Sequence, residues 1–577
     1  MTDHLDTNVL LRLMSWMSPA FPTGAFAYSN GLEAATVTTV GTVMVFYLFV
    51  LLFIGWRASR RTHGGEDFHL AGRSLGPWAA GISSTASSES GWVTLGAVGM
   101  TYTYGISGLW FAPGCLLGYL VNIYLVAPRL RELSAANGSV TLTDVICRRW
   151  GDPRNVLRLT ATTIILLCMM IYVASQMTAA GKAFSSSLGL DADGPGYLYG
   201  VLIGAAVITL VTVLGGFRAV AWTDLFQGLL VAVALIALPL WAIARIGGFG
   251  ALFSGLGAID PNLLTATGGR LGPAMWGFVI GNLGIGLGYP GMPHVVTRYM
   301  ATGSDRDVQR LQIIAMMWGV VVFYGSGLVG LVGRVSLPDL VDGERALMAL
   351  ALTFAHPVIA GLLLAAVISA ILSTVSSQLL VAASAVSYDV VEQAYGKARD
   401  DRRSLVLGRV TVAVVGVLGV LIALRGESMV FWFVLFAWSG LGASFAPLTL
   451  LALRDTWVNR YGALACMLTG AGVTVVWKLG IKMMTDPTTV SPLLFDRLWW
   501  MVIVTAAGIL IIGRLTGAFE VGHIAAVLAA TVLTLAGWFL VQRWGFHNLY
   551  ELVPAFALAA AAAFGVSALF RVEEQSS

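Results

Sequence analysis

The strongest constraint on the fold is a succession of apolar stretches that leaves little room for anything else. A helix needs ~20 predominantly apolar residues to cross a bilayer, and the chain offers about fifteen such stretches. They lie near residues 36–56, 76–103, 107–127, 156–182, 197–215, 225–244, 273–293, 311–333, 357–388, 406–424, 429–453, 461–482, 497–513, 521–541 and 549–570. Only 11% of the 577 residues are charged, about half the share in soluble domains. We predict an all-α polytopic membrane protein.

The basic residues gather in alternate connections between these stretches. Arg and Lys are frequent in connections 57–75, 128–158, 294–310 and 389–409, whereas connection 183–196 contains neither. Basic loops stay on the cytoplasmic side of a membrane. With an odd number of crossings, this pattern predicts an outside N-terminus and a cytoplasmic C-terminus in the plasma (inner) membrane.

Two of the crossings contain residues that a lipid-facing helix does not favour. Residues 76–100 carry serines, glycines and Glu89 in their middle, and residues 276–294 carry many glycines and Pro290. Irregular backbone at membrane depth is tolerated only where protein covers it or where it lines a cavity. Paired interruptions of this kind indicate the binding site of a transporter. We therefore predict two unwound segments, with a stretch from Ser83 to Gly91 facing a polar ligand.

Seven motifs, in order, resemble the sodium/solute symporter family and, within it, the bacterial sodium/proline branch. They are AGRSLGPW (71–78), SGW (90–92), IYVAS (171–175), GGFRAVAWTD (215–224), GLGYPGMPH (286–294), LSTVSSQLL (372–380) and AWSGLGASFAP (437–447). The resemblance runs from about Val43 to Lys478 and resumes from about Leu549 to Phe570. It implies a LeuT-like core of two inverted five-helix repeats with additional peripheral helices, about fifteen crossings in all.

The resemblance also suggests a division of the chain. The parts are an extramembrane N-terminal segment (1–35), a first crossing with its loop (36–75), a ten-helix transport core (76–453) and peripheral C-terminal helices (454–577). The last part includes an insertion, residues 479–548, where sodium/proline symporters have a short link. Residues 8–33 separately resemble the start of F-type urease accessory proteins. A fusion scar, a misassigned start, a leader peptide and a link to urea metabolism all remain open.

A sodium site is expected between two of the crossings. Sodium is a hard cation that takes oxygen ligands, and a transporter supplies them as carbonyls of an unwound helix and hydroxyls of a neighbour. The resemblance implies a site made by the backbone of Ala86, Glu89 and Ala370 with the hydroxyls of Ser373 and Thr374. Sodium would be the only metal, with no cofactor. The structural alternative is that these small residues only let helices approach closely.

The solute is expected between the broken parts of the two interrupted crossings. The resemblance places it near Ser88, Ser90, Gly91, Trp92, Tyr172, Ile285, Tyr289 and Pro293. N–H groups at the break in residues 76–100 suit a carboxylate, and the aromatic rings suit an apolar ring or stem.

The chain departs from the sodium/proline branch at three positions. Ser88 replaces an aspartate, Glu89 a methionine and Ile285 a tryptophan. The loss of the tryptophan changes the shape of the pocket and puts proline itself in question. A carboxylate inside a membrane is a functional-site hypothesis by default. Glu89 could stabilise sodium, carry a proton, pair with a substrate cation, or be a protonated group bonded within the bundle.

These observations predict a sodium-coupled symporter that imports a small polar solute, with an amino acid such as proline as the leading candidate. The alternatives are a proton-coupled transporter, a urea or small-carboxylate transporter of the same fold, and a transporter-like solute sensor. The seven histidines are scattered, and neither a catalytic triad nor a P-loop is evident, so no enzyme is predicted. The expected partners are the solute, sodium and the lipid bilayer. Nucleic acid is not expected. The sequence supports no prediction about protein partners, which stay unknown.

Overall fold

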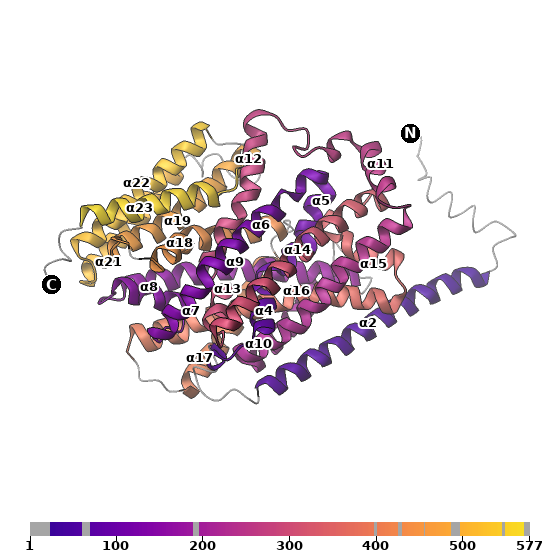
Figure 1. Cartoon of the computed structure of the whole chain (residues 1–577), viewed down its shortest axis with the longest axis horizontal. Coiled ribbons are helices and arrows are strands. Elements are labelled where there is room, and N and C mark those ends of the chain that lie inside the picture. The colour runs from indigo at the N-terminus through magenta and orange to yellow at the C-terminus, as the bar shows by residue number, and fades with distance from the viewer. Residues whose placement is uncertain are drawn as a thin grey trace, which may run out of the picture.

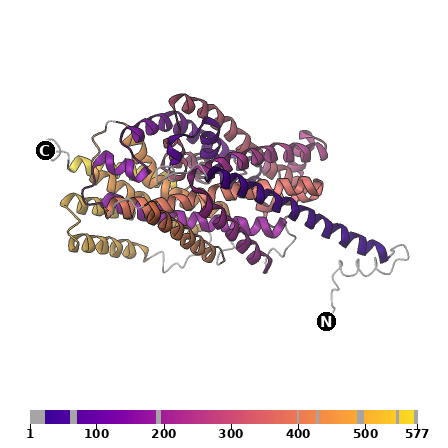
Figure 2. The ribbon, with the colours of Figure 1, turned by 90° about the horizontal axis from the view of Figure 1, so that it is seen from below.

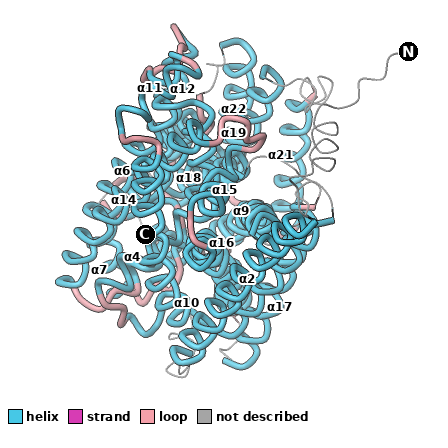
Figure 3. The backbone as a smooth tube through the Cα atoms, turned by 90° about the vertical axis from the view of Figure 1, so that its right-hand side faces the viewer, coloured by secondary structure: helices cyan, strands magenta, loops and turns pink. Residues whose placement is uncertain are grey.

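The computed structural model describes residues 23–59, 70–187, 195–396, 401–424, 430–454, 456–485, 497–544 and 549–570. Within these ranges the chain is built from helices, as Figure 3 shows. Their only β-contact is an isolated parallel bridge between Leu75 and Thr302. The prediction of an all-α protein is confirmed.

The α-helices within the described ranges succeed one another along the chain. They are α2 (Thr23–Ser59), α4 (Pro77–Gly91), α5 (Val98–Tyr104), α6 (Phe111–Leu120), α7 (Ala127–Ala136), α8 (Leu142–Trp150), α9 (Val156–Ser187), α10 (Pro195–Arg245), α11 (Phe249–Ile259), α12 (Gly272–Leu283), α13 (Pro293–Met300), α14 (Asp305–Ser336), α15 (Ala346–Phe354), α16 (Pro357–Ser384), α17 (Asp401–Ala423), α18 (Val430–Ala452), α19 (Arg460–Thr485), α21 (Leu498–Leu515), α22 (Val521–Trp544) and α23 (Leu552–Leu569).

Twelve helices in the described ranges are long and apolar enough to cross a membrane. The prediction of about fifteen crossings was approximate because several crossings are joined or broken. Pro77–Ala136 is one 60-residue stretch that covers two predicted crossings. α10 also covers two, and they meet at Gly216, where φ is 64°. α12 is short because its crossing is interrupted.

Burial separates central helices from peripheral ones. The apolar windows of α16 and α18 are 83% buried, whereas those of α2 and α21 are 22% and 17% buried. α9, α10 and α4 pack on α16, while α22 and α23 pack on α19. Figure 1 shows α2 along one edge and α21, α22 and α23 gathered at the opposite end, and Figure 2 shows α2 extending beyond the bundle. The described part of the insertion therefore forms the end of α19 and the outer helices α21 and α22.

The start of α2 lies inside the segment that was predicted to be extramembrane. The helix begins at Thr23, although its apolar window begins only at Val37. Residues 1–22, which hold most of the stretch that resembles urease accessory proteins, lie outside the described residues. The division of the chain into domains stays a prediction.

Both interrupted crossings are broken, as the Ser and Gly content predicted. α4 kinks at Ser90, where φ is 36° and ψ is −169°, and continues as a wide helical turn η2 (Trp92–Ala97) before α5. A positive φ on a residue other than glycine is costly and persists only where the surroundings impose it. In the second crossing, α12 tightens into η6 (Gly284–Gly291), and α13 begins at Pro293. Proline is favoured at the first position of a helix.

The first break is shorter than the predicted unwound segment. α4 stays helical through Glu89, and the hydroxyls of Ser84, Thr85, Ser87 and Ser88 bond to carbonyls of the same helix. Ser84 Oγ donates to the Gly81 carbonyl at 2.8 Å, and Ser88 Oγ donates to the Thr85 carbonyl at 2.7 Å. Ser and Thr side chains in a helix interior commonly bond back in this way. These serines therefore did not unwind the helix, and only Ser90 leaves it.

Candidate functional site

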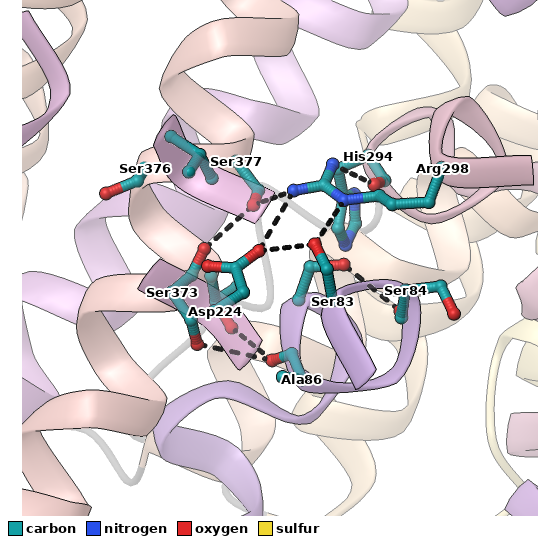
Figure 4. Close-up of polar contacts among 12 residues, drawn as sticks. Ser83, Ser84, Ala86, Asp224, His294, Arg298, Ser373, Ser376 and Ser377 are labelled. Atoms are coloured by element: carbon teal, nitrogen blue, oxygen red, sulfur yellow. Dashed lines mark hydrogen bonds and ion pairs between the residues drawn. The ribbon is translucent and has the colours of Figure 1, made fainter. Parts of the chain in front are cut away.

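Oxygen atoms of α4 and α16 converge at the predicted sodium site. Thr374 Oγ1 lies 3.2 Å from the Ala86 carbonyl oxygen, and Ser373 Oγ lies 3.4 Å from the same atom. Ser373 Oγ also lies 3.1 Å from the Ala370 carbonyl oxygen. All four residues are buried, and Figure 4 shows Ser373 facing Ala86. A cluster of neutral oxygens of this kind can hold a hard cation such as sodium.

Glu89, the fifth residue predicted for this site, contacts other helices. Its carboxylate accepts hydrogen bonds from Tyr119 Oη of α6 at 2.8 Å and from Trp318 Nε1 of α14 at 2.5 Å. Its backbone carbonyl accepts from the N–H of Trp92. The side chain is buried, and both donors are neutral. The structure thus brings together Ala86, the α16 hydroxyls and Ala370, whereas the Glu89 backbone carbonyl, which was the predicted ligand, is bonded to the Trp92 N–H.

Aromatic side chains surround the second break and include two residues of the predicted solute site, Tyr172 and Tyr289. Tyr289 of η6 meets Trp438 of α18 at 4.9 Å between ring centroids. His294 of α13 meets Trp438 at 6.4 Å and Tyr172 of α9 at 5.9 Å. All three contacts are edge-on, and Trp438 Nε1 donates to the Ile285 carbonyl at 3.1 Å. The aromatic cluster, meaning Tyr172, Tyr289, His294 and Trp438, therefore adjoins Ile285 and Pro293.

The N–H groups at the α4 break already have acceptors within the protein. Gly91 N donates to Gln176 Oε1 at 2.9 Å, and Trp92 N donates to Ser90 Oγ at 3.2 Å. Gly91 is held closely, since a Cβ there would lie 2.8 Å from the Ala179 side chain. The expectation that these donors receive a solute carboxylate has no support in this geometry.

Ser88 and Trp92 make their contacts with α6 and α14, and Tyr119 of α6 joins Ser88 to the aromatic cluster because its ring meets Tyr289 edge-on at 4.7 Å. Ser88 Oγ lies 3.0 Å from the Tyr119 hydroxyl. The Trp92 ring packs against Phe111 and Phe323, with centroids 5.8 and 6.2 Å away, and its Nε1 donates to the Ser88 carbonyl at 2.9 Å. These contacts hold α4 against α6 and α14.

A buried charged cluster, which the sequence did not predict, lies beside the oxygen cluster, meaning the oxygens of Ala86, Ala370, Ser373 and Thr374 (Figure 4). Arg298 pairs with Asp224 at 3.4 Å and donates to Ser83 Oγ at 3.1 Å, while Ser83 Oγ donates to Asp224 at 2.6 Å. Arg298 also donates to Ser377 Oγ and to the His294 carbonyl. Asp224, the last residue of the GGFRAVAWTD motif, is fully buried. A buried arginine and aspartate are tolerated together because each compensates the other's desolvation.

A narrow pocket leads from this charged cluster toward connections that are predicted to be cytoplasmic. Its lining includes Pro293, Arg298, Thr141 and Asp389. Thr141 Oγ1 donates to Asp389 at 2.8 Å. Arg158 bridges Asp389 and a second buried aspartate, Asp144, at 3.0 Å each. Arg158, Asp389 and Asp144 therefore form an ion cluster at the end of the pocket that faces the predicted cytoplasmic connections.

A second buried ion cluster lies among connections that are predicted to face outside. Lys182 at the end of α9 pairs with Asp342 at 2.9 Å and with Glu344, both in the turn between α14 and α15. The N–H of Val430, the first residue of α18, donates to Glu344 at 3.2 Å. Charged contacts thus join helices at both ends of the core.

Known proteins resemble this chain over most of its length. The sodium:solute symporter family matches residues 68–470. The osmoregulated proline transporter OpuE of Bacillus subtilis (strain 168) is 35% identical over 436 residues, which cover 75% of this chain and 87% of that protein. The sodium/proline symporter of Staphylococcus aureus is 34% identical over 464 residues, which cover 79% of this chain and 88% of that protein.

A solved structure of a Na⁺-coupled sialic acid symporter shares the fold. Its TM-score is 0.62 at 19% identity, and the match covers 86% of this chain and 98% of that one. The LeuT-like core predicted from the sequence is confirmed. Residues 8–33 lie outside the family match, so the urease-accessory resemblance has no support beyond the sequence.

These relatives are transporters and not enzymes, as the sequence predicted, and sodium is the coupling ion of the family. With its apolar crossings and its two broken helices, the chain is an integral membrane transporter that belongs to the sodium:solute symporter family.

Proposed function

We propose that this protein uses a sodium gradient to import a small polar amino acid across the plasma membrane, with proline as the leading candidate. The observation that carries the proposal is the approach of the Ser373 and Thr374 hydroxyls to the Ala86 carbonyl, at 3.4 and 3.2 Å. Relatives at 34–35% identity that carry the name of proline transporters support the solute class. We place the N-terminus outside and the C-terminus in the cytoplasm.

In the proposed cycle, sodium binds between α4 and α16 and the solute binds in the aromatic cluster at the second break. The ligands of sodium would be the oxygens of Ala86, Ala370, Ser373 and Thr374. Ser90, where α4 kinks, follows Ala86 by four residues, so the ion holds the helix within about one turn of its break. The transport function is assigned to residues 76–453, and the insertion is assigned a peripheral role.

The shape of the solute pocket differs from that of the sodium/proline branch in one respect. Ile285 stands where those proteins carry a tryptophan, and here the indole of Trp438 reaches the Ile285 carbonyl from α18. An aromatic surface is therefore supplied, but from another helix. Because of this difference, the uptake test must include another amino acid, a small carboxylate and urea beside proline.

The test is uptake into proteoliposomes that contain the purified protein. An inward sodium gradient should drive accumulation of labelled L-proline, and replacing sodium by potassium or adding a sodium ionophore should abolish it. Accumulation under a proton gradient without sodium would favour proton coupling. Accumulation of urea or a small carboxylate in place of proline would change the substrate class, and solute binding without flux under any gradient would identify a sensor.

A further inference from the structure

Three side chains of the aromatic cluster bury polar atoms that lack a well-formed hydrogen bond to a described residue. These atoms are both ring nitrogens of His294 and the hydroxyls of Tyr172 and Tyr289, which face Ser90 and Cys115 without reaching hydrogen-bond geometry. All three residues are fully buried. Buried polar groups in native proteins are nearly always hydrogen-bonded, so several such groups in one cluster indicate a place where a polar ligand completes the bonding.

His294 occupies a special position in this cluster. It is the second residue of α13, directly after Pro293, and its ring stands edge-on to Tyr172 and Trp438. Arg298 donates to the backbone carbonyl of His294 and so holds this turn without occupying the imidazole (Figure 4). The imidazole therefore keeps both nitrogens for another partner.

The surroundings of His294 favour an acidic group as that partner. The N-terminal end of a helix attracts negative charge, but the first position of α13 is a proline, which has no N–H to offer. A histidine at the second position supplies a donor from its side chain instead, and a neutral imidazole always has one donor and one acceptor. The competing donors at the α4 break are already bonded to Gln176 and Ser90.

We propose that His294 determines specificity by donating a hydrogen bond from its imidazole to the carboxylate of the transported solute. The hydroxyls of Tyr172 and Tyr289 complete the polar contacts, and the fixed Trp438 ring contacts the apolar part of the solute. This inference rests on the proposed function and narrows it. The solute is a small amino or imino acid with a free carboxylate, and urea is excluded.

The experiment compares L-proline with L-prolinamide, which keeps the ring and lacks the carboxylate. Binding of each to the purified full-length protein in sodium is measured for the wild type, His294→Phe and His294→Gln. The wild type should prefer proline by at least about tenfold. His294→Phe should weaken proline binding by about that factor and leave prolinamide binding nearly unchanged. His294→Gln retains a donor and should restore part of the preference.

His523→Phe is the matched control. His523 is also a buried histidine that stands edge-on to a tyrosine, Tyr461 at 5.0 Å, but it lies on peripheral α22. This variant should keep the wild-type preference. His294→Met makes the same removal of a donor should the Phe variant fail to fold, and sodium-dependent thermal stabilisation reports folding independently of the solute.

Two outcomes overturn the inference, and they can be told apart. If His294→Phe weakens proline and prolinamide equally, or leaves the preference unchanged, His294 does not bind the carboxylate, while the proposed function stands. If the wild type binds neither compound, nor any other amino acid offered with sodium, both the inference and the proposed solute class are wrong.

Discussion

Replacing Thr374 by alanine tests the sodium site most directly. Its hydroxyl is one of the four oxygens proposed to hold the ion, it lies 3.2 Å from the Ala86 carbonyl, and the residue is fully buried. A hydrogen-bonding group that contacts a charge contributes about 1.5–3 kcal/mol. Since about 1.4 kcal/mol corresponds to a tenfold change in affinity, Thr374→Ala should raise the sodium concentration for half-maximal uptake about 10- to 100-fold.

The assay is uptake of labelled L-proline into proteoliposomes as a function of external sodium. Thr374→Ser keeps the hydroxyl and should stay close to the wild type. Thr474→Ala is the matched control, because Thr474 is equally buried, lies on α19, and donates only to the Gly470 carbonyl of its own helix at 2.8 Å. It also loses a methyl group, at about 1 kcal/mol of stability, so it corrects for the general cost of Thr→Ala.

A half-saturating sodium concentration for Thr374→Ala within about twofold of the control would refute the reasoning. Such a result would mean that the hydroxyls of α16 serve only the packing of α16 against α4. A selective loss of solute affinity at unchanged sodium dependence would place the ion elsewhere. A variant that does not fold is separated from both cases by its thermal unfolding in detergent.

Three further changes test other contacts. Glu89→Gln should retain sodium-driven uptake with unchanged pH dependence, whereas Glu89→Ala leaves two buried donors unsatisfied at about 1–3 kcal/mol each, which thermal unfolding should detect. Arg158→Ala leaves the buried Asp389 carboxylate without its cation, while Asp144 keeps Arg148 at 3.0 Å, and should destabilise the protein by about 3–5 kcal/mol in the same assay. The Tyr461 hydroxyl, helped by Arg460, lowers the pKa of Glu520. Stability from this contact is therefore present at neutral pH and is lost as pH falls through the lowered pKa. Glu520→Gln should remove this pH dependence, by less than about 1 kcal/mol because the group is partly exposed.

The helix break and the oxygen cluster could be predicted because each depends on the residue types within a short stretch of sequence. Glycine and proline within a crossing weaken the helix wherever they occur, and the run from Gly284 to Pro293 breaks accordingly. Ser373 and Thr374 are adjacent in α16, and the residue that faces them on α4, Ala86, is small. Their hydroxyls therefore come within hydrogen-bond distance of the Ala86 carbonyl. In both cases the cause lies within a few residues of the effect.

The features that were missed depend on partners that are distant in sequence. Glu89 bonds to Tyr119 and to Trp318, which stands 229 residues further along the chain. No pattern in the sequence around Glu89 indicates that Tyr119 and Trp318 are its partners. Arg298 lies in a connection whose positive charges served to orient the chain. In the structure it belongs to α13 and is buried in the core, where it pairs with Asp224 and donates a hydrogen bond to Ser377. Hydropathy averages over a window and cannot distinguish a solvated charge from one that is buried with its partner.

The oxygen cluster also gives a physical reason for coupling. In the structure the hydroxyls of Ser373 and Thr374 donate to the Ala86 carbonyl. A cation held by the four proposed oxygens needs a lone pair of each of them, so both hydroxyl protons must turn away from the Ala86 carbonyl. Ser373 Oγ already lies 3.1 Å from the Ala370 carbonyl of its own helix. In the proposed site, sodium would replace two hydrogen bonds between α4 and α16 by ligand bonds, about one helical turn from the break at Ser90. Because coupling between two bound ligands is reciprocal, a solute that favours this arrangement of α4 raises sodium affinity by the same factor by which sodium raises the affinity for the solute.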